Sequence, residues 1–185
     1  RIIIAIDPGH GGSQPGAVAK SNGLKEKDVN LAVALKLQKL LKAAGFEVVM
    51  TRSTDIYVGL SERAKIANDA EADIFVSIHH NSNVDSGPVG TSVYYHPSSQ
   101  DGALLAKSIQ EELVKVCWDN ALGKDRGIRS ADFVVLRETI MPAVLCEAAF
   151  LSNPEEAALL ATDGFRQKEA QGIFNGILKY FNYLQ

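Results

Sequence analysis

The chain has 185 residues, of which 46% are hydrophobic and 22% are charged, values typical of one soluble globular domain. Its formal net charge of −3 argues against a general nucleic-acid binder, which would carry a basic face. No apolar run of the sequence is long enough to span a bilayer. Two cysteines, Cys117 and Cys146, do not make a disulfide framework, so we expect both to be buried free thiols.

Arg1 leads directly into an apolar run, so we expect no leader segment in this sequence. We therefore expect a mature or excised domain, and the start of such a domain gives no information on localisation.

Short apolar segments alternate along the chain with longer amphipathic ones. The expected strands are residues 2–6, 46–51, 73–78, 92–96, 133–136 and 143–146. The expected helices are residues 28–44, 60–69, 100–121 and 163–183, with a further helix that begins at Asn153 and Pro154. Residues 13–25 have no apolar periodicity and are expected to form a loop. The alternation predicts a single α/β domain over residues 1–185, with a mostly parallel twisted sheet of about six strands and helices on both faces.

Ionisable residues stand at the ends of three expected strands. His10 lies in the glycine-rich segment Asp7–Gly12 directly after the first strand, His79 follows the third, and Glu147 ends the strand that begins near Ala143. Ligands of such sheets bind beyond the carboxyl ends of the strands. We therefore expect these three side chains at one edge of one sheet.

Two histidines and a carboxylate are a common ligand set for a catalytic zinc, which usually takes three protein ligands. The expected ligands are His10, His79 and Glu26, because the loop after His10 can fold back over the strand end and bring Glu26 with it. Taken alone, each residue has a simpler interpretation. His10 can be a loop histidine bonded to the backbone, and Glu26, between two lysines, can be a solvated charge. Adjacent strand residues face opposite ways, so only one of His79 and His80 is expected at a shared ion.

A zinc hydrolase also needs a carboxylate that does not bind the ion. Zinc polarises a carbonyl and lowers the pKa of water toward about 7, and a second carboxylate then takes the proton and returns one to the leaving amine. Glu147 is the candidate, because it lies in the apolar segment Val144–Leu151, where burial raises the pKa of a carboxyl. A core arginine paired with Glu147 is the alternative. Strand alternation turns Cys146 away from Glu147, so Cys146 is discounted as a ligand.

Other familiar catalytic motifs are absent from the sequence. The glycine-rich segment lacks the third glycine of a dinucleotide fingerprint and the Gly-Lys-Ser/Thr ending of a phosphate loop. Neither a G-x-S-x-G elbow nor an H-E-x-x-H motif occurs.

With these residues identified, the chain resembles the zinc-dependent N-acetylmuramoyl-L-alanine amidases of the type 3 amidase family along nearly its whole length. The matching blocks are Ile6–Gly12, Glu26–Asp28, Thr51–Asp55, Leu60–Arg63 with Ala67–Asn68, Ala72–Asn81, Asp125–Ile128, Val135–Arg137 and Pro142–Asn153. The number, order and spacing of these blocks are specific to the family.

The resemblance implies that zinc is held by His10, Glu26 and His79 and that Glu147 is the catalytic glutamate. The implied reaction is hydrolysis of the amide that joins the lactyl group of N-acetylmuramic acid to the L-alanine of the stem peptide in peptidoglycan. The implied protein is a bacterial cell-wall lytic enzyme, extracellular or periplasmic, expected to be a monomer and to be joined to wall-binding modules outside this chain. Some family members carry a long helix that blocks the zinc site. This chain has no segment long enough for it, so we expect an open site that needs no activator.

Three positions depart from the usual family pattern. Gln14 replaces a frequent Asp, His80 replaces a frequent small residue, and Ala148–Ala149 replace a frequent Thr-Gly or Ser-Gly pair. We expect all three near the site, where they bear on substrate preference.

Two other functions remain open from the sequence: a zinc peptidase acting within the stem peptide, because the same ligand set serves both chemistries, and a wall-binding module that has lost catalysis. Arg126, Arg129 and Arg137 are candidates to contact a substrate carboxylate or, equally, structural arginines.

Overall fold

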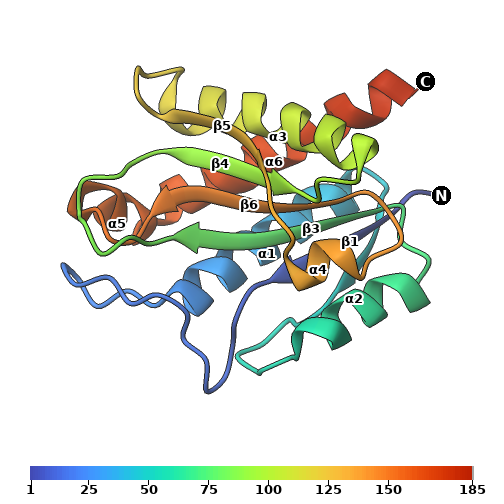
Figure 1. Ribbon diagram of the computed structural model, residues 1–185, viewed down its shortest axis with the longest axis horizontal. Helices are drawn as coiled ribbons and strands as arrows, with labels where there is room; N and C mark the ends of the chain where they lie inside the picture. The colour runs from blue at the N-terminus through green and yellow to red at the C-terminus, as the bar shows by residue number, and fades with distance from the viewer. Residues whose placement is uncertain (185) are drawn as a thin grey trace.

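The computed structural model describes residues 1–184, with side chains through residue 182. Six strands of this part of the chain form one sheet in the order β2-β1-β3-β6-β4-β5 (Figure 1). The strands are β1 (Ile3–Pro8), β2 (Glu47–Met50), β3 (Ile74–Asn81), β4 (Thr91–Tyr95), β5 (Asp125–Ser130) and β6 (Ala143–Phe150). Every neighbouring pair is parallel except β4 and β6, which are antiparallel. The predicted α/β domain with a mostly parallel six-stranded sheet is confirmed.

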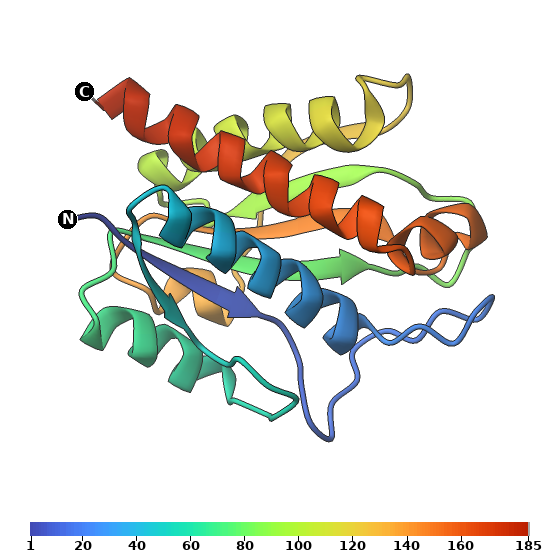
Figure 2. The ribbon, with the colours of Figure 1, turned by 180° about the vertical axis from the view of Figure 1, so that it is seen from behind.

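Helices cover both faces of the sheet. The helices are α1 (Glu26–Ala43), α2 (Leu60–Asp69), α3 (Gln100–Trp118), α4 (Val134–Arg137), α5 (Pro154–Leu160) and α6 (Asp163–Leu184). Helices α1, α3 and α6 cross one face (Figure 2), and α2 and α4 lie on the other (Figure 1). Helix α5 follows β6 at the end of the sheet.

Strand alternation divides the core into two layers. Ile4, Ile6 and Val76 belong to the larger cluster, which α1, α3 and α6 complete. Ala5 and Phe75 belong to a smaller cluster shared with α2 and α4. A side chain on the central strands therefore contacts one helical layer or the other according to its position in this alternation.

Two elements between residues 125 and 137 differ from the prediction. Residues 133–136 were expected as a strand, but α4 occupies Val134–Arg137. A four-residue apolar run fits a buried strand and a buried helical turn equally, and here Val135 and Leu136 pack into the smaller cluster as a helical turn. The strand β5 was missed, because this edge strand has the polar sequence DRGIRS and lacks the apolar alternation of a buried one.

The ends of two predicted elements also shift, and both shifts concern the site. Helix α1 begins at Glu26 rather than Asp28, and β3 continues to Asn81 rather than ending at Ile78. Glu26 is thus a helical residue and His79 a strand residue, so regular secondary structure holds both.

Cys117 and Cys146 are buried free thiols, as expected. Among the described residues, no helix is long and apolar enough to cross a membrane.

Candidate metal centre

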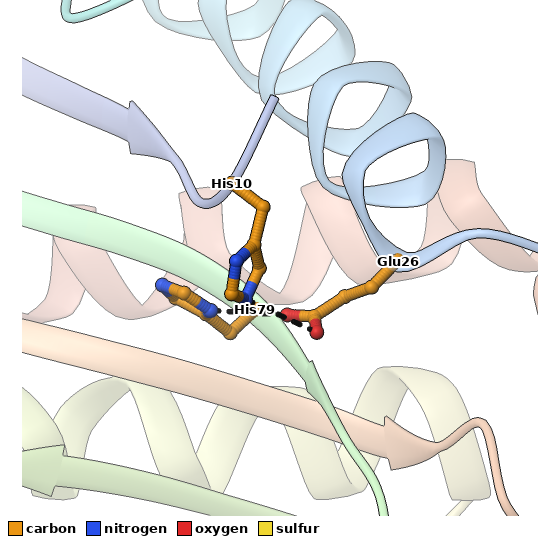
Figure 3. Close-up of side chains that lie close together, drawn as sticks. All are labelled: His10, Glu26 and His79. Atoms are coloured by element: carbon orange, nitrogen blue, oxygen red, sulfur yellow. Dashed lines mark hydrogen bonds and ion pairs between the residues drawn. The ribbon is translucent and has the colours of Figure 1, made fainter. Parts of the chain in front are cut away.

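Three side chains from distant parts of the chain meet at the carboxyl edge of the sheet (Figure 3). His10 comes from the loop after β1, Glu26 from the first residue of α1, and His79 from β3. His10 Nε2 lies 3.3 Å from Glu26 Oε1, and His79 Nδ1 lies 3.0 Å from Glu26 Oε2. One ligand atom from each residue lies within 4.8 Å of the other two. The structure therefore brings together the three residues that the sequence analysis selected.

This cluster fits a zinc ion in both chemistry and size. Imidazole nitrogen and carboxylate oxygen are usual zinc ligands, and two ligands of a tetrahedral zinc at about 2.0–2.1 Å lie about 3.4 Å from each other. The histidines lie 3.3 Å and 3.0 Å from the two different oxygens of Glu26, and one ligand atom from each residue lies within 4.8 Å of the other two. The His10 and His79 side chains are 31% and 17% exposed, so the cluster is accessible from solvent.

Glu26 is held as a carboxylate. It is only 4% exposed, and burial by itself raises the pKa of a carboxyl. Hydrogen bonds and positive charge from His10 and His79 outweigh that effect and hold the pKa of Glu26 well below its usual range. The backbone N–H of Ala17 also donates to Glu26 Oε1, at 3.1 Å. The residue is therefore ionised, as a metal ligand must be.

Two buried arginines hold the loop that carries His10. His10 has a φ of 60°, which is unusual for a residue other than glycine and needs external support. Arg63 donates to the carbonyls of Pro8 and His10 at 2.6 and 2.8 Å, and to Asp7 Oδ1 at 3.0 Å. Arg52 donates to Pro8 O and to the Gly9 carbonyl, both at 2.9 Å.

Neither arginine has a role that could be assigned from its sequence position alone. The available signal was the position of Arg63 beside Ala64 and Ala67, on the buried stripe of α2. A charged residue on such a stripe needs a buried partner, and Asp7 is that partner.

Gly9 leaves room for the His79 ring. A Cβ atom at Gly9 would lie 2.2 Å from His79 Cε1 and 2.3 Å from His79 Nε2. No side chain fits there without displacing the imidazole. The glycine before His10 is thus required by the packing of β1 against β3.

Glu147 lies beside the cluster but is not part of it. It is opposite His79 in the register of β3 and β6, and both residues border the same cavity. Burial raises the pKa of Glu147 to about 7; the nearby positive charge of His79 opposes this shift, and the charge of Glu26 adds to it. No hydrogen bond or ion pair joins its side chain to another described residue, so the alternative of a core arginine partner is not found. Arg63, the buried arginine nearby, pairs with Asp7 instead.

A cavity of about 300 Å³ connects His10, His79 and Glu147. Much of its lining is apolar and comes from two places: the segment before α2 with the first residue of that helix, and α4 with the residue before it. The wall residues include Tyr57, Val58, Leu60, Phe133, Val134 and Val135. An apolar wall facing a few polar groups is typical of a small-molecule or substrate site.

Of the three positions that depart from the usual family pattern, only Gln14 borders this cavity. His80 is buried on the opposite side of β3, and Ala148 and Ala149 are core residues. His80 therefore faces away from the cavity by strand alternation, although its backbone N–H donates to Glu26 Oε2 at 3.2 Å. The expectation that the departures lie at the site is wrong for the two alanines, which are buried in the core.

Arg126, Arg129 and Arg137 do not border the cavity. Arg137 donates to Asp132 at 2.9 Å, and Arg126 lies over the ring of Phe150 at 4.9 Å. For these two residues the contacts favour the structural interpretation.

The fold and the cluster together define an α/β domain with a His-Glu-His candidate metal site at the carboxyl edge of its sheet. The chain belongs to the Amidase_3 family, described as N-acetylmuramoyl-L-alanine amidase, whose model matches residues 4–179.

Several relatives found by sequence and by structure are amidases by name. N-acetylmuramoyl-L-alanine amidase LytC of Bacillus subtilis is 40% identical over 178 residues, which make up 96% of this chain and 35% of that protein. The sporulation-specific N-acetylmuramoyl-L-alanine amidase of the same species is also 40% identical and is matched over 98% of this chain and 69% of its own length. The solved catalytic domain of the amidase CwlV, from Bacillus (Paenibacillus) polymyxa var. colistinus, is 41% identical with a TM-score of 0.91, covering 98% of this chain and 99% of that one. This chain therefore spans about a third of LytC but nearly all of the CwlV domain.

Proposed function

We propose that residues 1–185 are the catalytic domain of a zinc-dependent N-acetylmuramoyl-L-alanine amidase that hydrolyses the amide between N-acetylmuramic acid and L-alanine in peptidoglycan. The observation that carries the proposal is the meeting of His10, Glu26 and His79 within 4.8 Å, at a cavity that Glu147 also borders. Membership of the family and the names of the relatives support the choice of bond.

In this proposal His10, Glu26 and His79 hold the zinc ion. When bound, zinc supplies a Lewis acid that polarises the amide carbonyl and lowers the pKa of water. Glu26 contributes the negative charge of the ligand set, because its pKa lies well below its usual range.

Glu147 is the proposed general base and acid. A base must accept a proton from the attacking water, and the same group must then donate a proton to the leaving nitrogen of the L-alanine. A pKa of about 7 makes both protonation states of Glu147 available near neutral pH. No described residue forms a hydrogen bond with the carboxyl group of Glu147. The group is therefore free to exchange protons with substrate and water.

The same proposal bears on how substrate reaches the site and on where the protein acts. Both histidines are partly exposed, so we propose that substrate reaches the site without an activator that first uncovers it. The substrate implies action at the cell wall or in the periplasm of a bacterium. We further propose that the domain works as a monomer. We also propose that it is joined to wall-binding modules outside this chain, because its net charge of −3 does not attract an anionic wall.

The test is the digestion of purified peptidoglycan followed by mass analysis of the released fragments. The proposal predicts intact stem peptides with a free L-alanine amino terminus, and no such release by the Glu147→Gln variant. Fragments cut within the stem would show a peptidase instead. Binding to the wall without release of fragments would show a module that has lost catalysis.

A further inference from the structure

A series of buried hydrogen bonds runs from α6 toward the candidate metal ligands, on the side of β3 away from the cavity. The His80 ring is its centre. His80 Nε2 lies 2.7 and 2.9 Å from the two carboxylate oxygens of Glu169, and Nδ1 lies 2.7 Å from Asn30 Oδ1. The side chains of His80 and Glu169 are at most 1% exposed. None of these three residues borders the cavity.

The hydrogen bonds of Asn30 determine which way its amide points. Asn30 Nδ2 donates to the carbonyl of Gly9 at 2.9 Å and to Glu26 Oε2 at 3.3 Å. A carbonyl and a carboxylate only accept hydrogen bonds, so the NH₂ group must face them and Oδ1 must face His80. It follows that His80 Nδ1 carries a proton and donates it to Asn30 Oδ1. Glu169 fixes the other end of the ring.

Asn30 thereby joins two segments that supply ligand candidates: the loop that carries His10 and the start of α1, which carries Glu26. The Gly9 carbonyl directly precedes His10, and Glu26 lies one turn before Asn30 on α1. Asn30 also completes the donors around Glu26 Oε2, which accepts from the backbone N–H of His80 at 3.2 Å. With these donors behind it, the carboxylate of Glu26 keeps its oxygens turned toward His10 and His79.

We propose that His80 and Glu169 are positioning residues of the metal centre. Glu169 fixes the His80 ring, and the Nδ1–H of His80 fixes the amide of Asn30. Asn30 in turn holds Glu26 and the His10 loop in place to bind the ion. This inference rests on the proposed function in that it takes His10 and Glu26 as ligands. If the His80 donor is lost, Asn30 Oδ1 has no partner and the amide can turn, which places an acceptor against the Gly9 carbonyl and the Glu26 carboxylate. Partners that orient metal ligands typically contribute about 10- to 100-fold to metal affinity.

Two double variants separate this role from simple packing. In His80→Asn the amide nitrogen takes a place close to Nδ1, whereas in His80→Gln the longer amide reaches toward the place of Nε2. Each is combined with Glu169→Gln, so that neither variant leaves a buried carboxylate without a counter-charge. The His80→Asn/Glu169→Gln variant retains a donor for Asn30. The His80→Gln/Glu169→Gln variant withdraws that donor and keeps the contact with residue 169.

The measurements are the zinc dissociation constant, from competition with a chromophoric chelator, and the unfolding midpoint of the zinc-free protein. We expect the His80→Gln/Glu169→Gln variant to bind zinc about 10- to 100-fold more weakly than the wild type. The His80→Asn/Glu169→Gln variant should bind within about threefold of the wild type, a difference of less than about 1 kcal/mol. Equal zinc affinities of the two variants, or a wild-type affinity in the His80→Gln variant, would overturn the inference.

A measurement on the unaltered chain tests the same claim without relying on a variant that folds. The nitrogen NMR shifts of ¹⁵N-histidine-labelled zinc-free protein report whether His80 Nδ1 bears a proton. A protonated Nδ1 is expected, and a deprotonated Nδ1 would overturn the inference. A wild type that binds no zinc would instead overturn the proposed function, so the two failures are distinguishable.

Discussion

His79 and Glu147 lie opposite each other on the adjacent parallel strands β3 and β6, and only His79 contacts Glu26. The strand pairing therefore places a ligand candidate next to a carboxylate that stays outside the ligand set. A metal hydrolase needs this division, since a group that binds the ion cannot also exchange protons freely. The sheet register, rather than a flexible loop, maintains the separation.

Replacing Glu147 is expected to separate metal binding from turnover. General acid–base groups contribute about 10²- to 10⁴-fold to rate, so Glu147→Gln should lower kcat by at least about 100-fold while zinc content stays at the wild-type value. Release of peptides from purified wall and metal analysis of the same samples check both halves. Glu155→Gln, an exposed glutamate at the start of α5, is the control and should retain full activity. An active Glu147→Gln enzyme would remove the assigned role.

The raised pKa of Glu147 predicts a pH-dependent stability of the zinc-free protein. The folded-state pKa of about 7 exceeds the ordinary value of 4.5, so the folded protein binds more protons than the unfolded chain between these pH values. Stability contributed by the protonated carboxyl is thus present below pH 4.5 and is lost as pH rises toward 7. The loss is at most about 3–4 kcal/mol at 1.36 kcal/mol per pKa unit.

Glu147→Gln removes this loss, because the amide does not ionise. The unfolding midpoint of the variant minus that of the wild type, both in a metal chelator, should increase from pH 4.5 to pH 7 and level off above it. A difference that is constant with pH would show that Glu147 has an ordinary pKa.

Gly9→Ala should weaken zinc binding without unfolding the domain. The new methyl group would meet the ring of His79 at 2.2 Å, and the ring must move to admit it. We expect at least about a tenfold weaker zinc affinity, as for other displaced ligand supports. Gly164→Ala on α6 is the matched control, because a Cβ atom there meets no atom within 4 Å. Equal zinc affinities of the two alanine variants would show that His79 tolerates displacement.

Arg63→Met should destabilise the fold as well as the site. Arg63 and Asp7 are 2% and 1% exposed, and removing one partner of a buried pair typically costs about 3–5 kcal/mol. Lys65→Met, on the same helix, removes a cation from an exposed pair with Asp69 and should leave the denaturant midpoint almost unchanged. Urea unfolding of the two variants gives the comparison, and similar midpoints would contradict the role given to Arg63.

The sequence predicted a candidate site residue wherever the pattern of its own segment determined its position. His10, His79 and Glu147 were selected because each stands at the end of an apolar run, and strand ends meet at one edge of a parallel sheet. Glu26 was selected because its loop can return to that edge, and the resemblance to the family agreed. Strand alternation also separated His79 from His80 correctly.

The rest depends on contacts between segments far apart in the chain. Arg63 donates to the Pro8 and His10 carbonyls, and Glu169 bonds to His80, which is 89 residues away in the chain. No local sequence pattern predicts either contact. The turn of α4 was mistaken for a strand because its apolar run is too short to show a period. The tertiary structure determines which side chains support a site. Periodicity and motifs in the sequence therefore do not predict them.

Metal analysis of the purified chain shows whether His10, Glu26 and His79 form one zinc site. After dialysis against buffer containing trace zinc, we expect one zinc per wild-type chain and per His96→Ala chain, because His96 pairs with Asp132 and is not one of the three clustered residues. We expect almost no zinc in His79→Ala and Glu26→Gln. Zinc retained by both of the last two variants, or absent from the wild type, would show that these residues do not form a zinc site.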